Sequence, residues 1–153
     1  MGNIPYNITS PILFWLIKQR SHWSDAYLMV QKEMAERLTG RVGTKAYGRL
    51  TVMIGVFMDV KICFNISPNV FIPKPKVESS IIRLVMKPKP LIRDDQFKRF
   101  EKIVQSAFSQ RRKMLRNSLK EFNFHLKIQE EIDFRRRPET LLIQEFVKLL
   151  QNR

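Results

Sequence analysis

The residues with the clearest chemical potential open the chain, in the run Gly2-Asn3-Ile4-Pro5-Tyr6. An exocyclic base amine is a weak nucleophile because its lone pair is delocalised into the ring. Two acceptors that bind both N–H groups would drive the nitrogen towards a tetrahedral shape, and the Asn3 side-chain oxygen and the Ile4 carbonyl beside Pro5 can form such a pair. Tyr6 can stack on the base, which would have to be unstacked or flipped. The alternative is a plain turn, because Gly, Asn and Pro are turn formers.

Phe71 is a second candidate for base stacking. It lies in a segment that three prolines stiffen: Pro68, Pro73 and Pro75. Phe71 would offer a second stacking face opposite Tyr6, and the prolines would hold its ring rigidly. The alternative is a core aromatic at the end of a strand. Lys74 and Lys76 in the same segment either contact phosphate or form a solvated loop.

The chain is strongly basic, with 28 Lys+Arg against 14 Asp+Glu and a formal net charge of +14. Such an excess favours a polyanionic partner, either nucleic acid or an anionic membrane surface. The densest cluster has five bases and no acid: Arg111, Arg112, Lys113, Arg116 and Lys120. If this segment is helical, Arg112, Arg116 and Lys120 share a face at i,i+4 spacing. We expect the cluster to bind RNA phosphates, against the alternative of a solvated helix face.

A second basic run, Arg135-Arg136-Arg137, precedes Pro138. These arginines either face RNA or pair in part with nearby acids. The acids in question are Glu130, Glu131 and Asp133. Arg49 likewise either contacts RNA or braces the catalytic segment.

Composition excludes several classes of protein. The lone Cys63 cannot form an intramolecular disulfide, which favours a reducing compartment, and we expect a cytoplasmic location. Two separated histidines, His22 and His125, make a metal site improbable, so no metal is expected. No apolar run approaches the roughly 20 residues of a membrane span, so no membrane partner is expected.

Hydrophobic periodicity predicts an α/β fold. Helices are expected over residues 11–19, with Ser10 as the N-cap, and over residues 32–38 and 49–57. Strands are expected over residues 26–31, of the buried parallel-sheet type, and over residues 60–66 and 77–86, paired as a hairpin. Beyond residue 91 the apolar spacing is helical throughout. Pro88 and Pro90 indicate a linker, so a boundary is expected near residue 90.

Several motifs resemble one enzyme family. Asn-Ile-Pro-Tyr at residues 3–6 matches the motif of adenine amino-methyltransferases that use S-adenosylmethionine. Further segments resemble the small-subunit ribosomal RNA adenine dimethyltransferases, the family linked to kasugamycin sensitivity. They are Gln31-Lys32-Glu33, Lys45-Ala46-Tyr47-Gly48-Arg49-Leu50, Phe71-Ile72-Pro73-Lys74-Pro75-Lys76-Val77-Glu78-Ser79, Ala107-Phe108-Ser109-Gln110-Arg111-Arg112-Lys113 and Arg116-Asn117-Ser118-Leu119.

The resemblance implies a fold, a reaction and a partner. Residues 1–90 would be the second half of a Rossmann-like methyltransferase sheet that begins at the Asn-Ile-Pro-Tyr motif, and residues 91–153 a small all-α RNA-recognition domain. The reaction would be N6,N6-dimethylation of two adjacent adenines near the 3′ end of 16S rRNA in the pre-30S particle, by a monomer. Asn3 and the Ile4 carbonyl would orient the amine, and Tyr6 and Phe71 would stack on the base.

The cofactor site is expected to be mostly absent from this chain. The resemblance implies a glycine-rich turn and acidic residues ahead of the Asn-Ile-Pro-Tyr motif, and this sequence has no G-x-G. Only Asn3 matches a cofactor contact. We therefore expect the carboxyl-terminal part of a longer enzyme, inactive alone. The alternatives are a non-catalytic rRNA-binding or ribosome-assembly module, and a 23S rRNA adenine methyltransferase of the macrolide-resistance type.

Overall fold

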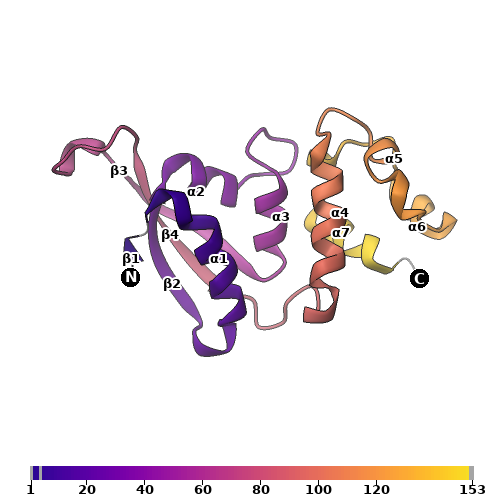
Figure 1. Cartoon of the computed structure of the whole chain (residues 1–153), viewed down its shortest axis with the longest axis horizontal. Helices are drawn as coiled ribbons and strands as arrows, with labels where there is room; N and C mark the ends of the chain where they lie inside the picture. The colour runs from indigo at the N-terminus through magenta and orange to yellow at the C-terminus, as the bar shows by residue number, and fades with distance from the viewer. Residues whose placement is uncertain (1, 4, 152–153) are drawn as a thin grey trace.

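The computed structural model describes residues 2–3 and 5–151, with the side chains of residues 5 and 7–151. In this part of the chain the strands are β1 (Gly2–Asn3), β2 (Asp25–Gln31), β3 (Met58–Ile66) and β4 (Ser79–Met86). The α-helices are α1 (Thr9–Lys18), α2 (Lys32–Leu38), α3 (Arg49–Gly55), α4 (Phe97–Ser109), α5 (Leu115–Ser118), α6 (Leu126–Glu131) and α7 (Ile143–Lys148). The predicted mixed α/β fold is confirmed (Figure 1).

The strands form one sheet in the order β1-β2-β4-β3. β3 and β4 are antiparallel neighbours, which confirms the expected hairpin. β2 runs parallel to β1, as the prediction for residues 26–31 expected, but antiparallel to β4, so the sheet is mixed, and β2 is not the fully buried strand that was expected. The burial of β2 alternates, as expected when one face of a sheet packs on helices and the other does not.

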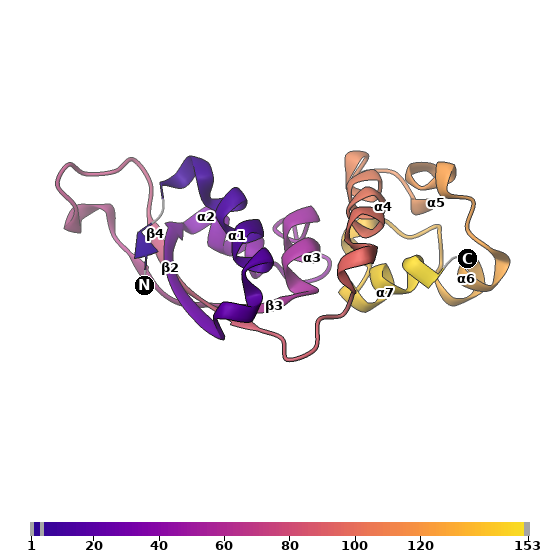
Figure 2. The ribbon, with the colours of Figure 1, turned by 60° about the horizontal axis from the view of Figure 1, so that its bottom comes forward.

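Helices α1, α2 and α3 lie on the same side of the sheet (Figure 2). The sheet residues that face them are buried, and they include Leu28, Val30, Ile82 and Leu84. Thr51 joins two of these helices, because its hydroxyl donates to the Arg37 carbonyl at 2.6 Å and accepts from the Gly48 N–H at 3.1 Å. This pair of bonds fixes the end of α2 against the start of α3.

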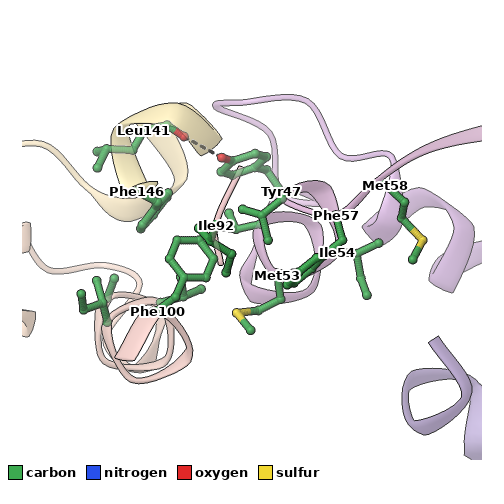
Figure 3. Close-up of a cluster of buried hydrophobic side chains, with 14 of the residues drawn as sticks. Tyr47, Met53, Ile54, Phe57, Met58, Ile92, Phe100, Leu141 and Phe146 are labelled. Carbon is green, nitrogen blue, oxygen red and sulfur yellow. Dashed lines mark hydrogen bonds between the residues drawn. The ribbon is translucent and has the colours of Figure 1, made fainter. Parts of the chain in front are cut away.

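Helices α4 to α7 lie beyond α3, away from the sheet (Figure 1). The hydrophobic core continues across the chain at residue 90, where Phe57 of the sheet side lies 5.9 Å from the Phe97 ring. Figure 3 shows Met53 near Phe100, and Phe146 next to Phe100, in this core. The chain is also held on either side of Pro88 and Pro90, because the Lys87 N–H donates to the Phe57 carbonyl and the Leu91 N–H donates to the Val56 carbonyl, both at 2.9 Å.

Two predicted helix boundaries were wrong. α1 begins at Thr9 rather than at Pro11, and its cap is Ile8 rather than Ser10, because a 3-10 turn at Tyr6–Ile8 runs directly into it. Pro11 is tolerated there because the first-turn N–H groups have no partner within the helix. α3 ends at Gly55, two residues before the expected end.

The expected helix through the basic cluster was also wrong. Residues 110–114 form a turn, in which Lys113 N–H donates to the Gln110 carbonyl at 2.8 Å, and α5 contains only four residues. Arg112, Arg116 and Lys120 therefore do not follow one another on a single helix. The cause is tertiary: the Leu115 and Arg116 N–H groups donate to the carbonyls of Arg136 and Phe134, both at 2.9 Å.

Candidate functional site

The candidate active site lies at one edge of the sheet. Asn3 pairs with Met29, and Gln31 and Ile66 both pair with Ser79. The carboxyl ends of β1, β2 and β3 and the start of β4 therefore coincide, and we call this the strand-end edge. In open α/β sheets the carboxyl ends of strands are the usual place for ligands.

The Asn-Ile-Pro-Tyr motif begins at this edge. The Asn3 backbone lies in β1, Pro5 follows, and Tyr6 opens a 3-10 turn that continues into α1. The predictions for Ile4 and for the side chains of Asn3 and Tyr6 fall outside the described residues. Pro5 accepts from the Ile8 N–H at 3.1 Å, which closes the turn behind the motif.

The 67–78 loop, which joins β3 to β4, carries Phe71 and leaves the same edge. Phe71 is half-buried, and its N–H donates to the Pro68 carbonyl at 3.3 Å. The Ile72–Pro73 peptide bond is cis. Lys32 holds the far end of the loop, because its Nζ lies 2.5 Å from the Glu78 carboxylate, whose hydrogen bond and charge raise the pKa of Lys32. The loop that carries Phe71 thus leaves the same edge of the sheet at which the Asn-Ile-Pro-Tyr motif begins.

The loop lysines and the helical basic cluster are not brought together. Lys74 and Lys76 are exposed on the 67–78 loop, at the end of the molecule opposite to α5 and α6 (Figures 1 and 2). The helical cluster lies beyond α3 and α4. Any polyanion that contacts both groups must therefore extend along most of the length of the molecule.

The predicted RNA-binding residues of the helical side fall into two groups: free side chains, which have no partner among the described residues, and engaged side chains, which bind another part of the protein. Arg112, Lys113, Arg116 and Arg137 are exposed, and within the described chain their side chains have no ion-pair or hydrogen-bond partner. The backbone bonds from α5 to residues 134 and 136 bring the segments that carry them side by side. We call these four side chains the basic surface. Arg111 is engaged instead, since it donates to the Lys45 and Thr44 carbonyls, both at 2.8 Å.

Arg135 and Arg136 are also engaged. Arg135 lies 3.1 Å from the Asp133 carboxylate, as one of the two interpretations expected, and the pair lowers the pKa of Asp133. Arg136 pairs with Glu145 at 2.5 Å, a partner that the sequence prediction missed. The two residues are separated by nine positions, and no helical or strand spacing links them. Arg49 is engaged too, since it lies 2.9 Å from Glu101.

A hollow of about 860 Å³ opens among α1, α2, α3 and the segment between α2 and α3, and from beyond residue 91 Arg111 joins its lining. Helix α1 contributes Ser10 and Phe14 to its wall, and Lys45 and Arg111 contribute basic side chains. Ser10 lies in the first turn of α1, so this wall of the hollow follows the Asn-Ile-Pro-Tyr motif by a few residues.

Within the described residues no group of three or more His, Cys, Asp or Glu side chains could hold a metal ion. No helix in the same part of the chain is long and apolar enough to span a bilayer.

Comparisons with known proteins agree with this geometry. The family model described as ribosomal RNA adenine dimethylase matches residues 1–149. The chain is 45% identical over 149 residues to the ribosomal RNA small subunit methyltransferase A of Prosthecochloris aestuarii. This match covers 97% of the chain and 56% of that protein. The protein of the same name from Flavobacterium johnsoniae is 43% identical, with 99% of this chain and 58% of the relative covered.

Solved structures of similar fold include two methyltransferases. A dimethyladenosine transferase from Plasmodium falciparum matches with a TM-score of 0.86 and 32% identity over 97% of this chain and 64% of that one. The 23S rRNA methyltransferase ErmE matches with a TM-score of 0.73 and 25% identity over 99% of this chain and 63% of that one. The chain thus spans somewhat more than half the length of the curated relatives it matches. Because the family model covers residues 1–149, the chain belongs to the ribosomal RNA adenine dimethylase family.

Proposed function

We propose that this chain is the target-binding and RNA-binding part of an enzyme that dimethylates two adjacent adenines near the 3′ end of 16S rRNA, acting as a monomer on the pre-30S particle in the cytoplasm. The single observation that carries the proposal is the family match over residues 1–149. The naming of the curated relatives as small-subunit methyltransferases favours this substrate over 23S rRNA.

In this proposal the strand-end edge receives the flipped adenine. Asn3 and the Ile4 carbonyl accept hydrogen bonds from the exocyclic amine, which localises the nitrogen lone pair for attack. Tyr6 and Phe71 stack on the base, each contact being worth about 1–3 kcal/mol. The half-buried position of Phe71 on the loop that leaves this edge supports its role.

S-adenosylmethionine is the methyl donor that the family implies. Of the cofactor contacts implied by the resemblance, only Asn3 belongs to this chain. Two of the glycines serve the connection after α2 instead, since Gly40 packs against the backbone of Tyr47 and Gly43 lies in the same connection. The residues present do not by themselves fit the cofactor, so no step is derived through it.

Methyl transfer by a completed chain tests the proposal. The chain would be joined to the region of the Prosthecochloris aestuarii relative that it does not match, and assayed on pre-30S particles with labelled cofactor. Asn3→Ala should lower transfer by at least about 100-fold, in line with the loss of a preorganised acceptor, while RNA affinity stays near that of the unchanged protein. Asn7→Ala, an exposed amide in the same segment, is the matched control.

Two outcomes would count against the proposal. An Asn3→Ala protein with an unchanged rate would remove Asn3 from the mechanism. RNA binding without transfer by the completed chain would favour the alternative of a non-catalytic ribosome-assembly module.

A further inference from the structure

The 41–48 loop joins α2 to α3, yet residues of the helical side hold it. Gly43 N–H donates to the Glu139 carbonyl at 2.8 Å. The Tyr47 hydroxyl, on a ring that is 1% exposed, donates to the Leu141 carbonyl at 2.7 Å (Figure 3). The loop is therefore a physical link between the sheet side and the segment before α7.

Arg111 adds the third attachment, from the turn after α4. Its two terminal nitrogens, Nη1 and Nη2, each donate to a loop carbonyl at 2.8 Å, one of Lys45 and one of Thr44. The rigid planar fork of a guanidinium suits two adjacent acceptors, whereas a lysine ammonium is a single point donor. A phosphate that bound these nitrogens in the same bidentate way would have to displace both carbonyls.

The residues beside Arg111 differ from it. Arg112 and Lys113 are exposed, and no partner for their side chains occurs among the residues described. The basic run Arg111-Arg112-Lys113 thus contains one side chain that is hydrogen-bonded within the protein and two that are exposed without a partner among the described residues, although the sequence shows one charge cluster. Only the charges after Arg111 are available to a polyanion without breaking a contact.

The 41–48 loop, which Arg111 holds, lies between the two surfaces that the RNA is proposed to contact (Figure 1). Arg111 and Lys45 both line the hollow among α1, α2 and α3, and the loop that Arg111 holds connects α2 and α3 to the segments that carry the basic surface. These two surfaces are at opposite parts of the molecule, so one RNA can reach both only if their spacing is kept (Figure 1). Linked contacts add to affinity only when the geometry allows simultaneous engagement.

We propose that Arg111 is a positioning residue that fixes the 41–48 loop to the helical side and thereby sets the spacing between the basic surface and the strand-end edge. Arg111 does not contact the RNA phosphate in this proposal. The inference rests on the proposed function, because it assumes that one RNA contacts both surfaces.

The test compares three single substitutions in the chain: Arg111→Gln, Arg111→Lys and the matched neighbour Arg112→Gln, which removes the same charge. Each is titrated with two RNAs, a short hairpin that covers only the basic surface and the same hairpin extended by a single strand long enough to reach the 67–78 loop. Arg111→Gln should leave the short hairpin's affinity and salt slope unchanged. It should weaken the extended RNA by about 3- to 10-fold, a small part of what linkage supplies.

The lysine variant separates positioning from phosphate contact. Arg111→Lys keeps the charge but loses the fork, so it should weaken the extended RNA as Arg111→Gln does. Arg112→Gln should weaken both RNAs and lower the salt slope by about 0.7–0.9. Full recovery of affinity in Arg111→Lys, or a lower salt slope for the short hairpin in Arg111→Gln, would overturn the proposal.

Hydrogen exchange provides a readout that does not depend on RNA. Amides of the 41–48 loop should exchange faster in both Arg111 variants than in Arg112→Gln, with similar exchange in the sheet. Equal loop exchange in all three proteins would refute the tether. If the unchanged chain binds neither RNA, the proposed function fails, and the exchange result still decides whether Arg111 holds the loop.

Discussion

At the scale of single residues, the burial and partners of each charge determine its role. Arg136 and Glu145 form a pair whose side chains are 33% and 20% exposed. Glu145 also accepts from the Leu142 N–H at 2.7 Å, at the start of α7. The Glu145 carboxylate therefore caps the N-terminus of α7, and its ion pair with Arg136 holds the arginine run against that helix.

The pH dependence of stability should reveal this pair. Partial burial raises the pKa of Glu145, but the Arg136 guanidinium and the Leu142 N–H together lower it by more, so the pKa lies below its usual value. A carboxyl whose folded pKa is depressed stabilises the folded state above its unfolded pKa of about 4.3 and loses that contribution as pH falls through the folded pKa.

Glu145→Gln should therefore lower the free energy of unfolding by about 1.5–3 kcal/mol at pH 7, the range for hydrogen bonds to charged groups. The difference from the unchanged chain should shrink as the pH falls below about 4.3. Urea denaturation at pH 7, 4 and 3 measures it. Glu130→Gln, an exposed residue on α6, is the control. A difference that stays constant down to pH 3 would contradict the assignment.

At the scale of elements, α3 lies between the sheet and the helical side. Its last residue, Gly55, contacts α7 so closely that a Cβ there would lie 2.4 Å from the Ile143 Cδ1. A glycine at the end of a helix is unfavourable by propensity alone. Here it allows α3 and α7 to approach, which joins the two parts of the core.

Gly55→Ala should lower the free energy of unfolding by up to about 1 kcal/mol, because the half-buried Ile143 side chain must move its flexible end aside to admit the new Cβ. Ile143→Val removes the clashing Cδ1, and the next atom, Cγ1, lies at an ordinary 3.8 Å. In the Ile143→Val background, Gly55→Ala should therefore be neutral or stabilising, because alanine favours helix over glycine by about 1 kcal/mol. A double-mutant cycle by thermal or urea unfolding measures this. Equal costs in both backgrounds would show that the contact does not limit α3.

At the scale of the whole molecule, the formal charge of +14 is distributed between engaged and free residues. Arg111, Arg135 and Arg136 have partners within the protein, whereas the basic surface of Arg112, Lys113, Arg116 and Arg137 has none among the described residues. Counterion release depends only on the charges that reach phosphates. The free group should therefore determine the salt dependence of RNA binding.

Replacement of Arg112 and Arg116 by Ala should weaken RNA binding and lower the slope of log affinity against log salt by about 0.7–0.9 per lost phosphate contact. Fluorescence anisotropy with a hairpin from the 3′ end of 16S rRNA, at several salt concentrations, measures the slope. Arg135→Ala is the control, since Arg135 is paired with Asp133. An unchanged slope in the double variant would mean that the basic surface is only a solvated face.

The sequence by itself determined most elements and the family. Strands β2, β3 and β4, the hairpin and the helix Lys32–Leu38 follow from local periodicity, whereas the short β1 was not predicted. The motifs from residue 3 onward identified the family that the comparisons confirmed. These features are local: side-chain alternation, helical spacing and short motifs are all carried by neighbouring residues.

Only the tertiary structure decided which charges are free and where the helical cluster breaks. The turn at residues 110–114 and the short α5 arise because the Leu115 and Arg116 N–H groups bind carbonyls of residues 136 and 134. Arg111 reaches carbonyls 66 and 67 positions away, and Arg136 pairs with Glu145 through folding rather than spacing. A charge run looks uniform in sequence, because the partners that occupy some of its members approach only when distant segments pack together.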